Sequence, residues 1–159
     1  MLERVGVEHT LRQFRATDFS AEEAARALRV PFASIVKTIV VRGDRTGVMR
    51  VCLTGPTRLS LQKLARVSGN KRVELVASEE LRRLTGYLRG GVSPLGGRGK
   101  HPVYCDASVL GAPRVLVNAG MRGVQIELDP KDLVRAADAA VADLTEDDDA
   151  GETTAAPYR

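Results

Sequence analysis

The sequence contains no tryptophan and only three tyrosines and three phenylalanines. So few aromatic side chains cannot form a wide stacking platform for single-stranded nucleic acid. No apolar run approaches the length of a membrane span, and the first residues do not resemble a signal peptide. We therefore expect a cytoplasmic protein that has no membrane partner.

Residues with metal-binding or nucleophilic chemistry are also few. The histidines His9 and His101 and the cysteines Cys52 and Cys105 lie far apart in the chain, so no spacing typical of a metal site occurs. We expect neither a metal nor a cofactor, and we expect the cysteines to be free, buried thiols rather than a disulfide. The sequence has no P-loop, no dinucleotide-binding glycine pattern, and no HExxH or GxSxG motif. A serine–histidine–aspartate mechanism therefore has little support.

The charge of the chain is unevenly distributed. The whole sequence carries +4, and residues 145–159, with five acids and one arginine, carry −4, which leaves +8 for residues 1–144. A basic body favours a polyanionic partner, first of all nucleic acid, although charge alone is equally compatible with a basic protein that binds none. We expect residues 1–144 to form one domain and the acidic, polar residues 145–159 to be a disordered tail.

Helix and strand signals are interleaved along residues 1–144. Helices are expected after the capping residues Ser20, Ser60, Ser78 and Asp129, and Glu23 is expected to complete a capping box with Ser20. Strands are expected at 35–41, 48–54, 73–76, 102–105, 115–118 and 124–128, with a further short strand within 141–144. The strands do not alternate strictly with long helices, so the pattern predicts an α/β or α+β domain and argues against a doubly wound sheet.

One lysine interrupts a strand that is otherwise apolar and β-branched. In the segment IVKTIVV, two-residue alternation places Lys37 on the face of Ile35, Ile39 and Val41, whereas Thr38 faces the other way. A lysine in such a strand must reach the edge of the sheet, pair with an acid or line a cavity. The strand pattern leaves these three alternatives open.

The segment GYLRGGVSPLG, residues 86–96, combines four glycines with Pro94. It cannot continue a helix or a regular strand, and its glycines allow the backbone to approach a ligand closely. It is either a long surface connection or a shaped loop that presents backbone N–H groups, with Tyr87 beside it. Ser93 in this loop lacks the strand–turn–helix context of a catalytic serine.

Several motifs together resemble those of the YbaK/proline-tRNA-editing family. They are IVKTIVV, LSLQKLARVSGNKRVEL, LTGYLRGGVSPLG, and VNAGMRGVQIEL followed by DPKDL, in the order and spacing of the family. The resemblance covers about residues 5–144. Members of this family are aminoacyl-tRNA deacylases, free-standing or inserted in prolyl-tRNA synthetase, that hydrolyse wrongly charged tRNA. The resemblance implies a mixed, largely antiparallel β-sheet flanked by helices. It also implies the aminoacylated acceptor end of tRNA as a partner, with prolyl-tRNA synthetase as a second candidate.

The resemblance also assigns site residues. The family's hallmark lysine matches Lys37, and its GxxxP loop matches 90–94, so that Gly90 and Gly91 lie closest to the reacting centre. The substrate-binding residues that it implies are Phe14, Thr38, Tyr87, Ser93, Pro94, Asn118, Gly120 and Gln125. Thr38 resembles the branch that removes cysteine. Asn118 and Gln125, however, stand where that branch usually has a serine and an acid, so the amino acid that is removed stays open.

These residues lead to the hypothesis of a trans-editing hydrolase for tRNA(Pro) charged with Cys, Ala, Ser or Thr. An aminoacyl ester is already activated, so Lys37 would hold a phosphate or carbonyl oxygen near the 3′ end, and the N–H groups of Gly90 and Gly91 would stabilise the oxyanion. A hydroxyl of the terminal adenosine, a water that it positions, or the thiol of a cysteinyl substrate would supply the base or nucleophile. The alternatives are a non-catalytic module that binds the tRNA acceptor end or the synthetase, and a hydrolase for another ester.

Overall fold

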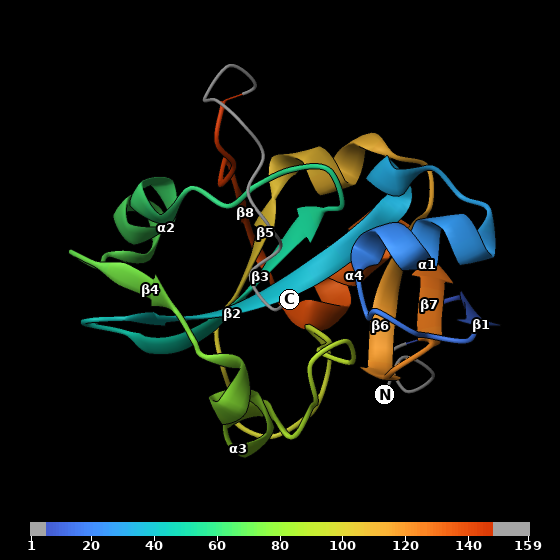
Figure 1. Cartoon of the computed structure of the whole chain (residues 1–159). Helices are drawn as coiled ribbons and strands as arrows, with labels where there is room; N and C mark the ends of the chain where they lie inside the picture. Colours follow the sequence, from blue (N-terminus) through green and yellow to red (C-terminus); the bar gives the residue numbers. More distant parts are fainter. Residues whose placement is uncertain (1–5, 148–159) are drawn as a thin grey trace.

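A mixed β-sheet with helices against both of its faces forms the centre of the protein, shown in Figure 1. The computed structural model describes residues 6–147. Within them the strands are β1 (His9–Gln13), β2 (Ile35–Gly43), β3 (Gly47–Thr54), β4 (Val73–Leu75), β5 (Val103–Asp106), β6 (Val115–Met121), β7 (Val124–Leu128) and β8 (Ala140–Ala142). The helices are α1 (Ala21–Leu28), α2 (Leu61–Ser68), α3 (Leu81–Thr85) and α4 (Pro130–Ala137), with 3-10 turns at Phe32–Ser34, Ser78–Glu80 and Ala107–Gly111.

The strands follow the order β1-β7-β6-β2-β3-β5-β8, and β4 also pairs with β2. Among the described residues, four pairings are antiparallel, namely β1–β7, β6–β7, β2–β3 and β2–β4. Three are parallel, namely β2–β6, β3–β5 and β5–β8. The predicted mixed, largely antiparallel sheet is therefore confirmed.

Alternation along β2 explains how the helices divide between the two faces of the sheet. Ile39 and Val41 pack with Leu64 of α2, and Ile35 packs with α1. Residues of the opposite parity pack elsewhere: Val36 shares a core with α4, and Val40 shares one with α3. In Figure 1, α2 and α3 accordingly lie on opposite sides of the long β2. Lys37 thus belongs to the face that α1 and α2 cover.

The sheet divides along one edge of β2. β6 pairs with β2 only at Ile35–Val36, and β4 pairs with it only from Val41 onward. Among the described residues, positions 37–39 therefore have no strand partner on that side, although β3 pairs with them on the other. Beyond Val117, β6 no longer pairs with β2, and its register with β7 is irregular between Asn118 and Met121. This division places the edge of β2 beside open space.

Local sequence signals account for most element ends. Ser60 and Asp129 cap α2 and α4 with their side chains, and Gly69 and Gly86 end α2 and α3 in left-handed conformation. Two predictions at helix starts were wrong, the cap at Ser78 and the return bond from Ser20 N–H to Glu23 in the capping box. Ser78 begins a 3-10 turn without a side-chain cap, because α3 starts only at Leu81. The side chain of Ser20 caps α1 as predicted, but the Ser20 N–H donates to Asp18 instead of Glu23. The Glu23 carboxylate accepts the N–H groups of residues 17–19, the turn before the helix, instead.

Three further predictions concern the thiols, the tail and membranes. Cys52 and Cys105 are free and buried, as predicted, and lie side by side in the β3–β5 register. The neighbouring Cys105 thiol and burial raise the pKa of Cys52 well above its ordinary value. Most of the tail that the sequence predicts to be disordered, residues 148–159, lies outside the described residues. Within residues 6–147 no helix is long and apolar enough to cross a membrane.

Candidate functional site: a cavity where the sheet divides

A cavity of about 1060 Å³ lies where β2 and β6 separate. Its walls come from the edge of β2, the start of α1, the 55–60 loop with α2, and the glycine-rich loop after α3. Six of the residues that the resemblance singles out line it: Phe14, Lys37, Thr38, Gly90, Asn118 and Gln125. Because the cavity opens at the edge of a strand, Lys37 and Thr38 both reach it although their side chains leave opposite faces of β2.

Lys37 is held at the cavity wall by backbone carbonyl groups. Its Nζ donates hydrogen bonds to the carbonyl oxygens of Gly55 at 2.9 Å and Thr57 at 2.5 Å. The two acceptors carry no net charge, and they fix the direction of a long side chain that is otherwise mobile. The structure shows that Lys37 lines a cavity, which is one of the three alternatives that the strand pattern leaves open.

Gly90 forms a second wall and is held in place from two sides. Its φ is +83°, and a Cβ built on it would lie 2.4 Å from the Cβ of Phe19, so no other residue fits without displacement. Its carbonyl oxygen accepts a 2.9 Å hydrogen bond from the Asn118 side-chain amide, whose oxygen accepts the N–H of Gly120 at 2.7 Å. Asn118 therefore ties the glycine-rich loop to β6.

Phe19 is a wall residue that sequence reasoning missed. Its φ of +64° is in the left-handed region, where side chains other than glycine are strained. The buried carboxylate of Glu23 stabilises this turn, because it accepts the N–H groups of Thr17, Asp18 and Phe19 and the hydroxyl of Thr17. Burial alone would raise the pKa of Glu23, but these hydrogen bonds outweigh it and lower the pKa. The guanidinium of Arg122 stacks 4.0 Å from the centre of the Phe19 ring.

Two polar atoms in the cavity wall are buried without a hydrogen-bond partner among the described residues, the hydroxyl oxygen of Thr38 and the amide oxygen of Gln125. Their side chains are 8% and 6% exposed. The Thr38 hydroxyl does interact with the Cys52 thiol, but not with the geometry of a hydrogen bond. Buried polar groups are normally paired, so two orphans at one cavity are the pattern of a site that is completed by a ligand.

Five of the predicted residues do not line this cavity: Gly91, Tyr87, Ser93, Pro94 and Gly120. The prediction that the Gly91 N–H faces the reacting centre was wrong for this conformation, because that N–H donates to the Leu88 carbonyl at 2.8 Å. Ser93 is buried, and its hydroxyl accepts the N–H of Leu95. Pro94 lines a smaller hollow on another side of the loop.

Tyr87 also supports the loop instead of contacting the cavity. Its hydroxyl donates to the Leu95 carbonyl at 2.5 Å, and its ring lies so close to Gly97 and Gly120 that a Cβ on either would come within 2.7 Å of it. Burial raises the pKa of this phenol. Gly97 and Gly120 are therefore required for close packing against the Tyr87 ring.

Arg50 of β3 is the buried centre of the glycine-rich loop. It is 2% exposed and donates to the carbonyl oxygens of Ser93 (3.1 Å), Gly96 (2.7 Å) and Arg98 (2.9 Å), and to Nδ1 of His101 (3.2 Å). Burial lowers the pKa of His101, so the ring stays neutral and can accept this bond. The hydrogen bonds of this one guanidinium thus fix the conformation of a loop that lacks regular secondary structure. Arg50 is not among the predicted site residues, although its charge interrupts an apolar strand as that of Lys37 does.

Cations line the cavity together with the acids Asp18, Glu22, Glu146 and Asp147. Arg58, Lys63 and Arg66 line it from the 55–60 loop and α2, and Arg89 lines it from the glycine-rich loop. Within the described part of the chain, no group of three or more histidine, cysteine or acidic side chains could hold a metal ion. The cavity can place the Lys37 ammonium and the Gly90 backbone around a bound group, with further cations in the lining.

Comparisons with known proteins show which family the chain resembles. The family model described as "Aminoacyl-tRNA editing domain" matches residues 18–136. A candidate Cys-tRNA(Pro)/Cys-tRNA(Cys) deacylase named EbsC, from Enterococcus faecalis, is 38% identical over 126 residues, 79% of this chain and 77% of that protein. A proline–tRNA ligase of Lactobacillus gasseri is 30% identical over 106 residues, which are 67% of this chain and 19% of the ligase. The crystal structure of a candidate trans-editing enzyme for prolyl-tRNA synthetase superimposes with a TM-score of 0.81 and 34% identity, covering 92% of both chains.

Proposed function

The chain belongs to the aminoacyl-tRNA editing domain family, and on that premise we propose that it is a trans-editing deacylase, which hydrolyses the ester of misacylated tRNA(Pro). The observation that carries the proposal is that Lys37 and Gly90 both lie in the walls of one cavity. The cations in the lining, Arg58, Lys63, Arg66 and Arg89, support a nucleic acid as the carrier of the ester, since positive charge attracts phosphate.

Lys37 and Gly90 would act on the reacting ester from different walls. The Lys37 ammonium, oriented by two carbonyl groups, binds a phosphate or carbonyl oxygen near the 3′ end of the tRNA. The N–H of Gly90 stabilises the negative charge that develops on the ester oxygen as water or a neighbouring hydroxyl attacks. Asn118 and Phe19 serve to hold that backbone in position.

The acyl group is recognised, in this proposal, by Thr38 and Gln125. The Gln125 oxygen is an acceptor only, so a substrate must bring it a donor. A cysteinyl, seryl or threonyl side chain has an S–H or O–H to donate, whereas an alanyl side chain has no donor and forgoes a hydrogen bond worth about 0.5–1.5 kcal/mol. We therefore expect the enzyme to prefer Cys, Ser or Thr over Ala.

A substrate panel tests the proposal. The purified protein is incubated with tRNA(Pro) charged separately with Cys, Ala, Ser and Thr, and ester loss is compared with that in buffer. We expect acceleration for at least one polar amino acid and about a tenfold lower rate for alanine. Tight tRNA binding without cleavage of any ester would instead favour a non-catalytic acceptor-end module. Equal activity on small aminoacyl esters and on charged tRNA would indicate a hydrolase for another ester.

A further inference from the structure

The mouth of the cavity is lined by acids as well as by cations. Glu146 and Asp147, which follow β8, contribute to the lining beside Arg58 and Lys63. The Arg58 Nε lies 3.6 Å from a carboxylate oxygen of Glu146, and the Lys63 Nζ lies 3.4 Å from one of Asp147. The positive charges where a polyanion would enter are therefore already in contact with anions of the same chain.

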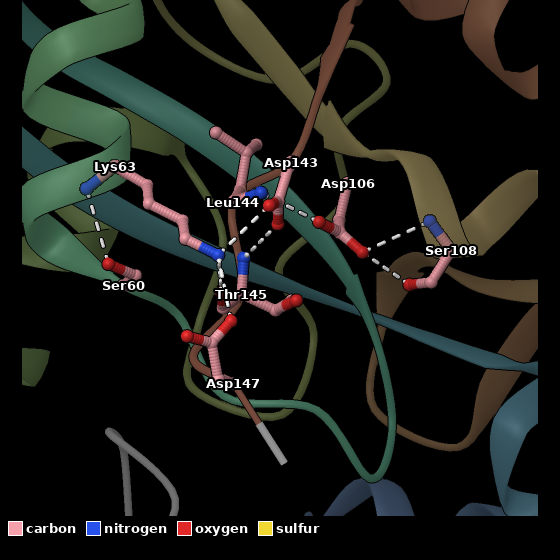
Figure 2. A network of polar contacts seen from close by, with 8 residues as sticks. All are labelled: Ser60, Lys63, Asp106, Ser108, Asp143, Leu144, Thr145 and Asp147. Atoms are coloured by element: carbon pink, nitrogen blue, oxygen red, sulfur yellow. Dashed lines mark hydrogen bonds and ion pairs between the residues drawn. The ribbon is translucent and has the colours of Figure 1, made fainter. Parts of the chain in front are cut away.

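The backbone of this acidic segment, residues 143–147, is anchored. The buried Leu144 donates its N–H to Asp106 at 2.8 Å, and its carbonyl accepts the N–H of Ser60 at 2.8 Å. The N–H of Glu146 donates to the Arg58 carbonyl at 2.9 Å. Figure 2 shows the contact between Asp106 and Leu144 next to the segment's ion pairs. An anchored backbone keeps the carboxylates at high effective concentration beside the cations.

Lys63 is the centre of these contacts. In Figure 2 its side chain extends from α2 towards the acidic segment, where it donates to Asp143 at 2.9 Å and to the Thr145 carbonyl at 2.7 Å. The hydrogen bond to Asp143 raises the pKa of Lys63, so the ammonium stays charged. The Asp143 and Asp147 side chains are 70% and 80% exposed. Ion pairs of this kind are weak and screened by salt, so another anion can replace the carboxylates.

We propose that Arg58 and Lys63 bind the sugar-phosphate backbone next to the terminal adenosine of tRNA, and that Glu146 and Asp147 occupy this surface in the free protein as competitors. The proposal rests on the proposed function, because that function brings the acceptor end to this mouth. A carboxylate and a phosphate form the same charge-assisted hydrogen bonds, so they compete for the donors of one cation. The acidic segment then lowers affinity for nucleic acid without contacting the reacting ester.

The double substitution Glu146→Gln/Asp147→Asn removes both carboxylates and retains their size. The matched control is Glu74→Gln/Glu79→Gln, which changes the net charge equally at exposed positions that do not line the cavity. Binding of uncharged tRNA is measured at about 50 mM and 200 mM salt, where phosphate contacts differ strongly in strength. We expect the first variant to bind about three- to tenfold more tightly than the wild type at low salt, and the control to change less than twofold.

A double-mutant cycle that combines Lys63→Gln with Glu146→Gln/Asp147→Asn makes the test independent of general charge effects. Loss of Lys63 should weaken tRNA binding more in the Glu146→Gln/Asp147→Asn background than in the wild type, because there the ammonium has lost Asp147, one of its two carboxylate partners, and keeps only Asp143. Equal tightening by both double variants, no tightening by either, or an additive cycle would overturn the inference. Deacylation is assayed in parallel. If the acid variant binds more tightly but cleaves no ester, the proposed function fails while the competition stands.

Discussion

Replacing Gly90 by alanine tests whether the shape of the loop backbone, and not merely its presence, forms the site. Gly90 has a φ of +83°, and an added Cβ would lie 2.4 Å from the Cβ and 2.8 Å from the Cγ of Phe19. Carbon atoms in contact are normally about 3.5–4.0 Å apart, so Gly90 or Phe19 must move by about 1 Å. Both residues line the cavity.

The expected cost has two parts. A left-handed conformation of a residue with a Cβ costs about 1–2 kcal/mol. Relieving an overpacked contact costs about 1–3 kcal/mol more. We therefore expect Gly90→Ala to lower the free energy of unfolding by about 2–5 kcal/mol. A shift of about 1 Å in a catalytic wall lowers rates by about a hundredfold, so kcat/KM for deacylation should fall by at least tenfold.

Gly69 supplies the matched control. It has a φ of +78°, and a Cβ there would have nothing within 4 Å. Gly69→Ala should therefore destabilise by only the conformational part, about 1–2 kcal/mol, and leave deacylation unchanged. Urea unfolding and single-turnover deacylation are measured for both variants. Equal destabilisation by the two substitutions, or full activity of Gly90→Ala, would refute the role assigned to the contact with Phe19.

Three other substitutions test separate parts of the site. A lysine at position 50 cannot bond all four acceptors of the Arg50 guanidinium, so Arg50→Lys should lower the free energy of unfolding by about 2–4 kcal/mol. The free energy is measured by urea titration, and an unchanged midpoint would contradict the role of Arg50 in holding the loop. Glu23→Gln should destabilise at neutral pH. Because the folded pKa of Glu23 is lowered, its stabilisation is present above the unfolded pKa of about 4.3 and is lost as pH falls through the folded value, so the difference between wild type and variant should shrink in acid. A difference that is constant with pH would exclude a role for the carboxylate charge. Gln125→Leu removes a buried unpaired oxygen, so thermal unfolding should show equal or greater stability while KM for the preferred charged tRNA rises; unchanged KM would rule out recognition by this oxygen.

The positions of the main elements could be predicted from local patterns. The apolar, β-branched run around Lys37 is β2, and the caps Ser60 and Asp129 begin α2 and α4. The same alternation placed Lys37 on the correct face of the strand. What it could not give was the cavity, because the division between β2 and β6 depends on where the register of distant strands ends.

The glycine-rich loop could be predicted only in part. Its glycines indicate a functional segment, yet of Gly86, Gly90, Gly91 and Gly96 only Gly90 lines the cavity. The loop is shaped by Arg50, whose hydrogen bonds to Ser93 and Gly96 span 43 and 46 residues of the chain, and by the left-handed Phe19. The charge of Arg50 marks its strand, but the loop that Arg50 and Phe19 contact is set by tertiary packing and cannot be predicted from local patterns.

The central claim is that the cavity wall at Lys37 participates in ester cleavage. The most direct measurement is the single-turnover rate of deacylation, on the tRNA that the wild type cleaves fastest, for Lys37→Met. The control is Lys131→Met, which removes the same charge from an exposed position of α4 outside the cavity. We expect Lys37→Met to lose at least about a hundredfold in rate while it retains its fold, since groups that stabilise a transition state have effects of this size, and Lys131→Met to remain within about twofold. A Lys37→Met rate equal to that of the control would contradict the account.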